Sequence, residues 1–290
     1  MDVLSLLSNS SPLLITLTLI LGLLVGSFLN VVIYRLPVMM QTDWQQQCRQ
    51  LLDPDKTPKQ GERFNLIVPA SACPSCQHAL HLWENIPVLS YLFLKGRCSQ
   101  CQTLISPRYP VIEVTTGVCS ALVSWHFGLA WQALAVLVLT WSLIVLTMID
   151  YDHQLLPDSI TLPLVWLGLI CNSLGLFTTL EAALWGAVAG YLSLWSVYWL
   201  FKLVTGKEGM GYGDFKLLAA LGAWMGWDLL PVIILLSSLT GVVVGISLIL
   251  FFGRDRTIPI PFGPYLAAAG LITMFQGKQL INTYLNFIGL

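Results

Sequence analysis

The sequence predicts an all-α membrane protein that crosses the bilayer about eight times. Of the 290 residues, 56% are hydrophobic and only 10% are charged. Soluble domains do not need that much apolar surface, whereas helices that face lipid do. The apolar residues gather into eight runs, of which the sixth is short and the eighth is interrupted by polar residues. These runs cover residues 13–34, 110–128, 130–149, 159–178, 181–203, 214–227, 229–252 and 263–287.

The first run predicts a retained transmembrane helix rather than a cleaved signal peptide. Residues 1–12 contain no Lys or Arg, and the run ends in Tyr34-Arg35-Leu36-Pro37 instead of a small-residue cleavage site. Signal peptides need a basic start and a small-residue end. We therefore expect residues 1–34 to form the first membrane helix, with its C-terminal end in the cytoplasm.

The basic residues predict the orientation of the other crossings. With residues 35–109 in the cytoplasm and eight crossings, all 14 Lys and Arg residues except Lys278 fall on the cytoplasmic side. Cytoplasmic loops are enriched in Lys and Arg, so this distribution favours the assignment. Both termini would then face the periplasm.

Two aspartates mark the cytoplasmic ends of two predicted spans. Asp150 ends the third run, and Asp214 begins the sixth within Gly211-Tyr212-Gly213-Asp214. Carboxylates at such positions are costly and indicate function. Two carboxylates at the same depth suggest a pair that acts together as general acid and general base, as in an aspartic protease. A helix N-cap is the alternative role for Asp214, but the neighbouring glycines favour close approach of a peptide.

Two further acids follow the third run. Asp158 comes after Pro157 and before the fourth run, a position that predicts a helix N-cap. Asp152 lies about 200° from Asp150 around a continuous helix, so the two cannot face one cavity. We interpret Asp152 as a solvated residue at the membrane interface.

Residues 35–109 are expected to form a cytoplasmic segment with a zinc site. Residues 39–65 are polar and predict a mobile insert. Two CxxC pairs follow, separated by residues 77–97, and this spacing predicts a tetrahedral zinc site of the zinc-ribbon type. Bound zinc would supply folding free energy to a segment too small to bury its own core. The alternatives are two disulfides or a redox pair, and a cytoplasmic location disfavours lasting disulfides. The four predicted ligands are Cys73, Cys76, Cys98 and Cys101.

Several motifs together resemble the type IV prepilin peptidases, which are bifunctional enzymes of bacterial inner membranes. The resemblance covers nearly the whole chain. Besides the CxxC pairs, it rests on residues 26–37 (GSFLNVVIYRLP), 84–87 (ENIP), 90–92 (SYL), 105–110 (ISPRYP), 113 (E), 150–158 (DYDHQLLPD) and 211–216 (GYGDFK).

The resemblance implies two activities at the cytoplasmic membrane face. Enzymes of this family remove a short basic leader from type IV prepilins and type II secretion pseudopilins, and then methylate the new N-terminus with S-adenosylmethionine. Their catalytic pair, of the GxGD aspartic protease type, corresponds to Asp150 and Asp214. Related proteases use a Tyr-Asp motif, so Asp152 of Tyr151-Asp152 is the second candidate. Which carboxylate acts as the base stays open.

The methyl-donor site is not located by the sequence. No strand–helix–strand pattern with a glycine loop is evident, so the cytoplasmic segment is the expected site by elimination. Arg108 and Glu113 could equally form an ion pair that orients the second helix. The polar candidates for donor binding are Glu84, Asn85, Arg108 and Glu113.

Three regions are thus expected: a first membrane helix (1–34), a cytoplasmic zinc segment (35–109) and a seven-helix membrane domain with the aspartates (110–290). The partners are pilins and the lipid bilayer, while a net charge of −1 indicates no nucleic acid. The alternative function is a polytopic transporter, because membrane carboxylates also mark ion pathways. Against it, both aspartates lie at one face and no repeated halves are evident.

Overall fold

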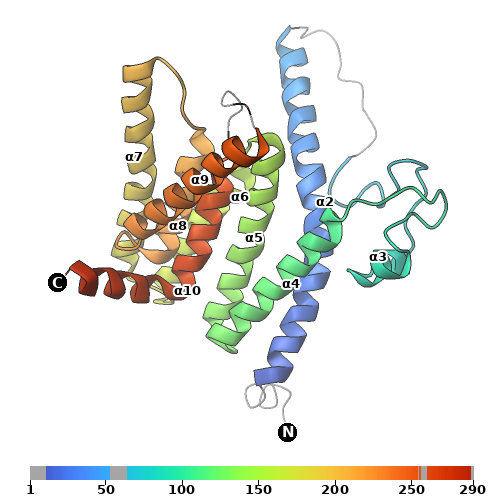
Figure 1. Ribbon diagram of the computed structural model, residues 1–290, viewed down its shortest axis with the longest axis horizontal. Helices are drawn as coiled ribbons and strands as arrows, with labels where there is room; N and C mark the ends of the chain where they lie inside the picture. The colour runs from blue at the N-terminus through green and yellow to red at the C-terminus, as the bar shows by residue number, and fades with distance from the viewer. Residues whose placement is uncertain (1–10, 53–63, 254, 256–259, 289–290) are drawn as a thin grey trace. The chain divides into compact units, whose positions relative to one another are not determined.

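A computed structural model describes residues 11–52, 64–253, 255 and 260–288, and these residues form helices without any β-strand (Figure 1). Each expected apolar run overlaps one helix. The elements are α2 (Ser11–Leu52), the 3-10 helix η1 (Leu82–Asn85), α3 (Leu89–Phe93), α4 (Arg108–Phe127), α5 (Trp131–His153), α6 (Asp158–Ser173), α7 (Leu180–Thr205), α8 (Tyr212–Met225), α9 (Leu230–Phe252) and α10 (Gly263–Ile288).

The helical fold class is confirmed, and among the described residues four helices are long and apolar enough to cross a membrane: α2, α5, α7 and α9. The count of eight crossings stays a prediction. The chain forms two compact units, Met1–Ala133 and Leu134–Leu290.

In the first unit, α2 and α4 pack closely through small residues. A Cβ on Gly22 would lie 2.5 Å from Ser120 Oγ, and a Cβ on Gly26 would lie 2.7 Å from Glu113 Cα. Only glycine allows the two backbones to come this near, which is the usual way in which apolar helices associate inside a bilayer. The glycine that opens the sequence motif at residues 26–37 therefore has a packing role.

Helix α2 is longer than the expected span of residues 13–34, because it continues past Pro37 to Leu52. The expectation of a mobile insert was therefore wrong for residues 39–52. Residues 41–52 (QTDWQQQCRQLL) are mostly good helix formers, and they extend a helix that has already been nucleated. Residues 53–63 of the insert, with Lys56, Lys59 and Arg63, lie outside the described residues.

In the second unit, α8 packs against α6, α7, α9 and α10. Its residues from Asp214 to Met225 are buried, except for a half-buried Lys216. The helix rises only about 21 Å over its length, less than the hydrocarbon thickness of a bilayer. Enclosure by other helices explains why the sixth apolar run is so short.

Glycine also permits the contact between α7 and α8. A Cβ on Gly186 would meet the carbonyl oxygen of Gly222, and a Cβ on Gly190 would lie 2.7 Å from the carbonyl oxygen of Leu218. The two backbones therefore touch along one side of α8. This contact fixes the helix that carries Asp214.

Candidate active site and cysteine cluster

Asp150 lies in the last turn of α5, which continues through His153. Only 5% of the Asp150 surface is exposed, whereas Asp152 is exposed. Because the helix is continuous, the angular separation derived from the sequence applies, and the two side chains face different surroundings. The expectation that they do not share a cavity is confirmed.

Asp214 lies in the first turn of α8 and is not its N-cap, because Gly211 occupies that position. Its backbone N–H donates to the carbonyl oxygen of Gly211 at 3.3 Å, and 7% of the residue is exposed. A Cβ on Gly213 would lie 2.7 Å from Leu156 Cβ. The glycine before Asp214 thus lets this turn approach the segment between α5 and α6.

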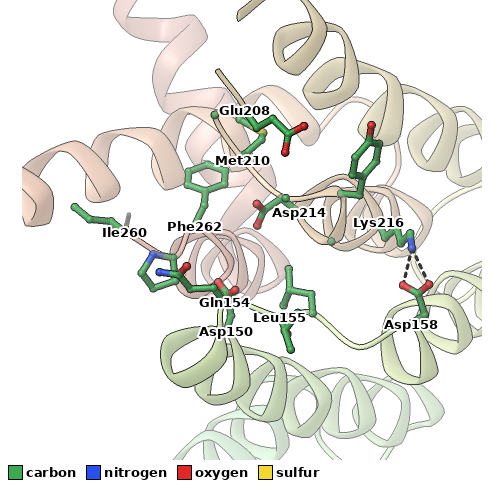
Figure 2. A pocket seen from close by; sticks show the side chains of 16 residues that line it. Asp150, Gln154, Leu155, Asp158, Glu208, Met210, Asp214, Lys216, Ile260 and Phe262 are labelled. Carbon is green, nitrogen blue, oxygen red and sulfur yellow. Dashed lines mark hydrogen bonds and ion pairs between the residues drawn. The ribbon is translucent and has the colours of Figure 1, made fainter. Parts of the chain in front are cut away.

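Asp150 and Asp214 line one cavity of about 490 Å³, and both side chains point into it (Figure 2). Asp150 comes from the end of α5 and Asp214 from the start of α8. The cavity also has apolar walls, to which Met210 and Phe262 contribute. The arrangement offers two carboxylates beside an apolar surface on which a peptide could lie.

Asp158 does not cap α6, so this expectation was wrong. Pro157 is the N-cap residue, and no side chain accepts a hydrogen bond from the first turn. Instead, the Asp158 carboxylate accepts from Lys216 Nζ at 2.6 and 2.8 Å, as Figure 2 shows. The ion pair joins α6 to α8 two residues after Asp214. It is partly exposed and therefore contributes little to stability.

The four predicted zinc ligands lie together between α2 and α4. Their sulfur atoms all lie within 4.8 Å of one another; the Sγ atoms of Cys73 and Cys101 are 3.7 Å apart, and those of Cys76 and Cys98 are 3.9 Å apart. A tetrahedral zinc ion with Zn–S bonds of about 2.3 Å places its sulfurs about 3.8 Å apart. The cluster therefore has the dimensions of a four-cysteine zinc site.

Backbone and hydroxyl groups favour the thiolate form of two cysteines. The amides of Cys76 and Ser75 lower the pKa of the Cys73 thiol. The hydroxyl and amide of Thr103 lower the pKa of Cys101 to about 6. Zinc binds the thiolate, so Cys73 and Cys101 suit the metal in charge as well as in spacing.

The two CxxC pairs have the same local structure, a repeat that was not predicted from the sequence. In each, the first cysteine and the glutamine after the second cysteine make matching backbone hydrogen bonds. Gln77 and Gln102 also share a left-handed conformation, with φ of 59° and 57°. The CxxCQ sequence common to both pairs was the available signal. The matching bonds are Cys73 N–H to His78 O, Cys98 N–H to Thr103 O, Gln77 N–H to Cys73 O and Gln102 N–H to Cys98 O.

Two of the four methyl-donor candidates hold the backbone in place. Glu84 Oε2 accepts from the His81 N–H at 2.7 Å, and Glu113 Oε2 accepts from the Val88 N–H at 2.8 Å. The hydroxyl of Ser99, and then the His81 amide, lower the pKa of Glu84. Asn85 is exposed and Arg108 is half-buried. None of these four candidates lines the cavity of the aspartates.

The chain is similar to known protein families along most of its length. Residues 20–127 match the bacterial peptidase A24 N-terminal domain, and residues 137–246 match the type IV leader peptidase family. No solved structure matches the chain.

Three relatives from different bacteria carry the same name, prepilin leader peptidase/N-methyltransferase. A protein of Stutzerimonas stutzeri is 60% identical over 96% of both chains. One of Pseudomonas aeruginosa is 58% identical over 94% of this chain and 93% of its own. One of Neisseria gonorrhoeae is 53% identical over 92% of both chains. The chain therefore belongs to the type IV leader peptidase family, as its motifs predicted.

Proposed function

We propose that this protein removes the leader peptide from type IV prepilins and type II secretion pseudopilins, and then N-methylates the exposed amine. The observation that carries the proposal is the aspartate pair: two carboxylates from separate helices, both buried, line one cavity. The names of the relatives supply the substrate class and the second activity.

Asp150 and Asp214 are the proposed catalytic residues. Two neighbouring carboxylates disfavour double ionisation, so the pair holds one proton between them. The ionised member takes a proton from water, which attacks the scissile carbonyl, while the protonated member stabilises the oxyanion. The apolar cavity wall around Met210 and Phe262 suits the apolar N-terminal helix of a pilin.

The protein is proposed to reside in the bacterial inner membrane with eight crossings, both termini in the periplasm and the aspartates at the cytoplasmic face. The coincidence of eight apolar runs with eight helices supports this topology, as does the distribution of basic residues. Four helices meet the length and apolarity expected of a span. The shorter α8 would be enclosed within the bundle by the helices that pack against it.

The cysteine cluster is proposed to hold a structural zinc ion. Cys73, Cys76, Cys98 and Cys101 would fill a tetrahedral coordination shell, which leaves no position for a reacting water. The metal would therefore stabilise residues 64–107 without entering the peptidase chemistry. S-adenosylmethionine would supply the methyl group, with the cytoplasmic segment as its proposed site.

The donor candidates can be separated by titration with S-adenosylmethionine. Glu84 and Glu113 carry backbone hydrogen bonds, so we expect Asn85→Ala or Arg108→Ala to weaken binding more than Glu84→Gln, provided that the variant segment stays folded. Unchanged affinity in both the Asn85 and the Arg108 variants would exclude them from the donor site.

The proposed activity is tested by incubating the purified protein in lipid with a prepilin and S-adenosylmethionine. Mass spectrometry should find the released leader and a mature N-terminus that carries one methyl group. Brief treatment with a metal chelator should leave cleavage intact, because the aspartates need no metal. An intact prepilin after incubation with the folded protein would contradict the peptidase and favour the transporter.

A further inference from the structure

The first turn of α10 holds the Asp150 carboxylate. The Gly263 N–H donates to Asp150 Oδ2 at 2.9 Å in a buried hydrogen bond. The first amides of a helix have no partner within the helix, so this N–H is available to an acceptor. Pro264 follows and has no N–H of its own. A carboxylate that accepts an amide hydrogen bond is stabilised as the anion.

Glycine is required at this point of α10. A Cβ on Gly263 would lie 2.6 Å from Asp150 Oδ2 and 3.1 Å from its carboxyl carbon. Any side chain at residue 263 would displace the carboxylate from the amide. The start of α10 thus brings a backbone N–H donor without a side chain to the end of α5.

Asp214 has a different environment. Its carboxylate interacts with the Gly211 amide, but Oδ1 is buried and has no hydrogen-bond partner among the described residues. A buried, unpaired oxygen is costly in an anion and less costly in a neutral carboxylic acid. Both aspartates lie near a helix N-terminus, so the helix dipole does not distinguish them. The hydrogen bond from the Gly263 N–H to Asp150 Oδ2 distinguishes the two carboxylates.

We propose that Asp150 is the general base, that Asp214 carries the shared proton as the acid, and that Gly263 is the positioning residue for Asp150. This assignment rests on the proposed peptidase function, and deepens it by giving each carboxylate one role.

The assigned roles complete a balanced hydrolysis. The Asp150 carboxylate takes one proton from water as the water oxygen bonds to the scissile carbonyl carbon, and Asp214 gives its proton to the carbonyl oxygen. Asp150 then gives its proton to the leaving nitrogen while Asp214 recovers a proton from a hydroxyl of the tetrahedral intermediate. The C–N bond breaks, one water is consumed, and both carboxyls return to their starting states.

The titratable groups near Asp150 come from the cavity wall, from its own helix and from α10. Asp214 is the titratable group opposite it, and Lys216 is engaged by Asp158. The segment from Ile260 to Phe262 contributes no titratable side chain to the cavity. The other titratable groups on the cavity wall are Glu208 and Tyr212. Tyr151, Asp152 and His153 lie on the same helix as Asp150, and Tyr265 lies in the first turn of α10.

The test is the pH profile of kcat/KM for leader cleavage by Gly263→Ala, with Gly270→Ala as the matched control. Both glycines are in α10, and a Cβ at residue 270 would also lie 2.6 Å from a side-chain atom, here of Leu221. The acidic limb reports ionisation of the base. Loss of the amide bond makes the anion less favourable, so the limb should move to higher pH by about one unit, a tenfold change. Gly270→Ala should keep the wild-type limb.

An unshifted limb in active Gly263→Ala, or an equal shift in Gly270→Ala, would overturn the assignment while leaving the peptidase intact. Wild-type protein without cleavage would instead overturn the proposed function. If Gly263→Ala fails to fold, single-turnover cleavage by Asp214→Asn and Asp150→Asn decides. An amide can donate to the oxyanion but is a poor base, so Asp214→Asn should be at least about tenfold faster. Equal rates, or no cleavage by either, would count against the assignment.

Discussion

Replacing Asn172 should destabilise the helix that carries Asp214. Asn172 lies in the last turn of α6, and only 2% of it is exposed. Its Nδ2 donates to the carbonyl oxygens of Ala223 at 2.8 Å and Trp224 at 3.0 Å, at the end of α8. Its Oδ1 accepts from the N–H groups of Phe177 at 3.2 Å and Thr178 at 3.0 Å. One amide therefore satisfies four backbone groups.

The loss in Asn172→Ala follows from these four bonds. Each contributes about 1 kcal/mol net, and an unpaired buried group costs at least as much. Phe177 and Thr178 line a cavity at the protein surface, so water can replace two of the bonds. The two carbonyls of α8 are more deeply buried and lose their partner. The expected destabilisation is therefore about 2–4 kcal/mol, or a fall of about 10 °C in melting temperature.

The assay is thermal unfolding of the purified variants in one detergent, followed by the loss of the monodisperse species in size-exclusion chromatography. Ser173→Ala is the matched control, because Ser173 is exposed and its hydroxyl bonds only to Ile170 O within the same helix. That change should alter stability by less than about 0.5 kcal/mol. Equal melting temperatures for the two variants would refute the role given to Asn172.

Two further changes test the cysteine cluster and the helix packing. Cys98→Ser should abolish zinc binding and open residues 64–107 to proteolysis. Replacement of the exposed Cys48 should have neither effect. Metal analysis measures zinc binding, and limited proteolysis measures the opening of the segment. Gly222→Ala should cost about 1–3 kcal/mol in thermal unfolding, because its Cβ would meet the Gly186 carbonyl. Gly241→Ala, with 3.5 Å to the nearest atom, should change little; equal losses would contradict the packing argument.

Much of the helical architecture was predictable, because a chain that faces lipid must satisfy its backbone internally and expose apolar side chains. The separation of Asp150 from Asp152 followed from helical periodicity alone. The cysteine cluster was predictable because its ligands are close in sequence and of one type. These features depend on local sequence pattern and on whether a segment faces lipid or water. The spacing and hydropathy of the residues indicate both.

The features that were missed depend on distant partners. Asp158 was assigned to a cap because its neighbours in sequence suggest one, yet its charge pairs with Lys216 of another helix. Gly263 follows Asp150 by more than a hundred residues, and nothing in the sequence marks its amide as a donor to that carboxylate. The length of α2 was underestimated because polarity was taken to indicate mobility, whereas its polar residues are good helix formers.

The central claim is that Asp150 and Asp214 form the catalytic pair. It is tested most directly by following leader removal from a prepilin, by gel mobility, in membranes that contain wild type, Asp150→Ala, Asp152→Ala or Asp214→Ala at equal amounts. We expect cleavage by wild type and Asp152→Ala, and none by the other two. Full cleavage by Asp214→Ala, or loss in Asp152→Ala with activity kept in Asp150→Ala, would contradict the claim.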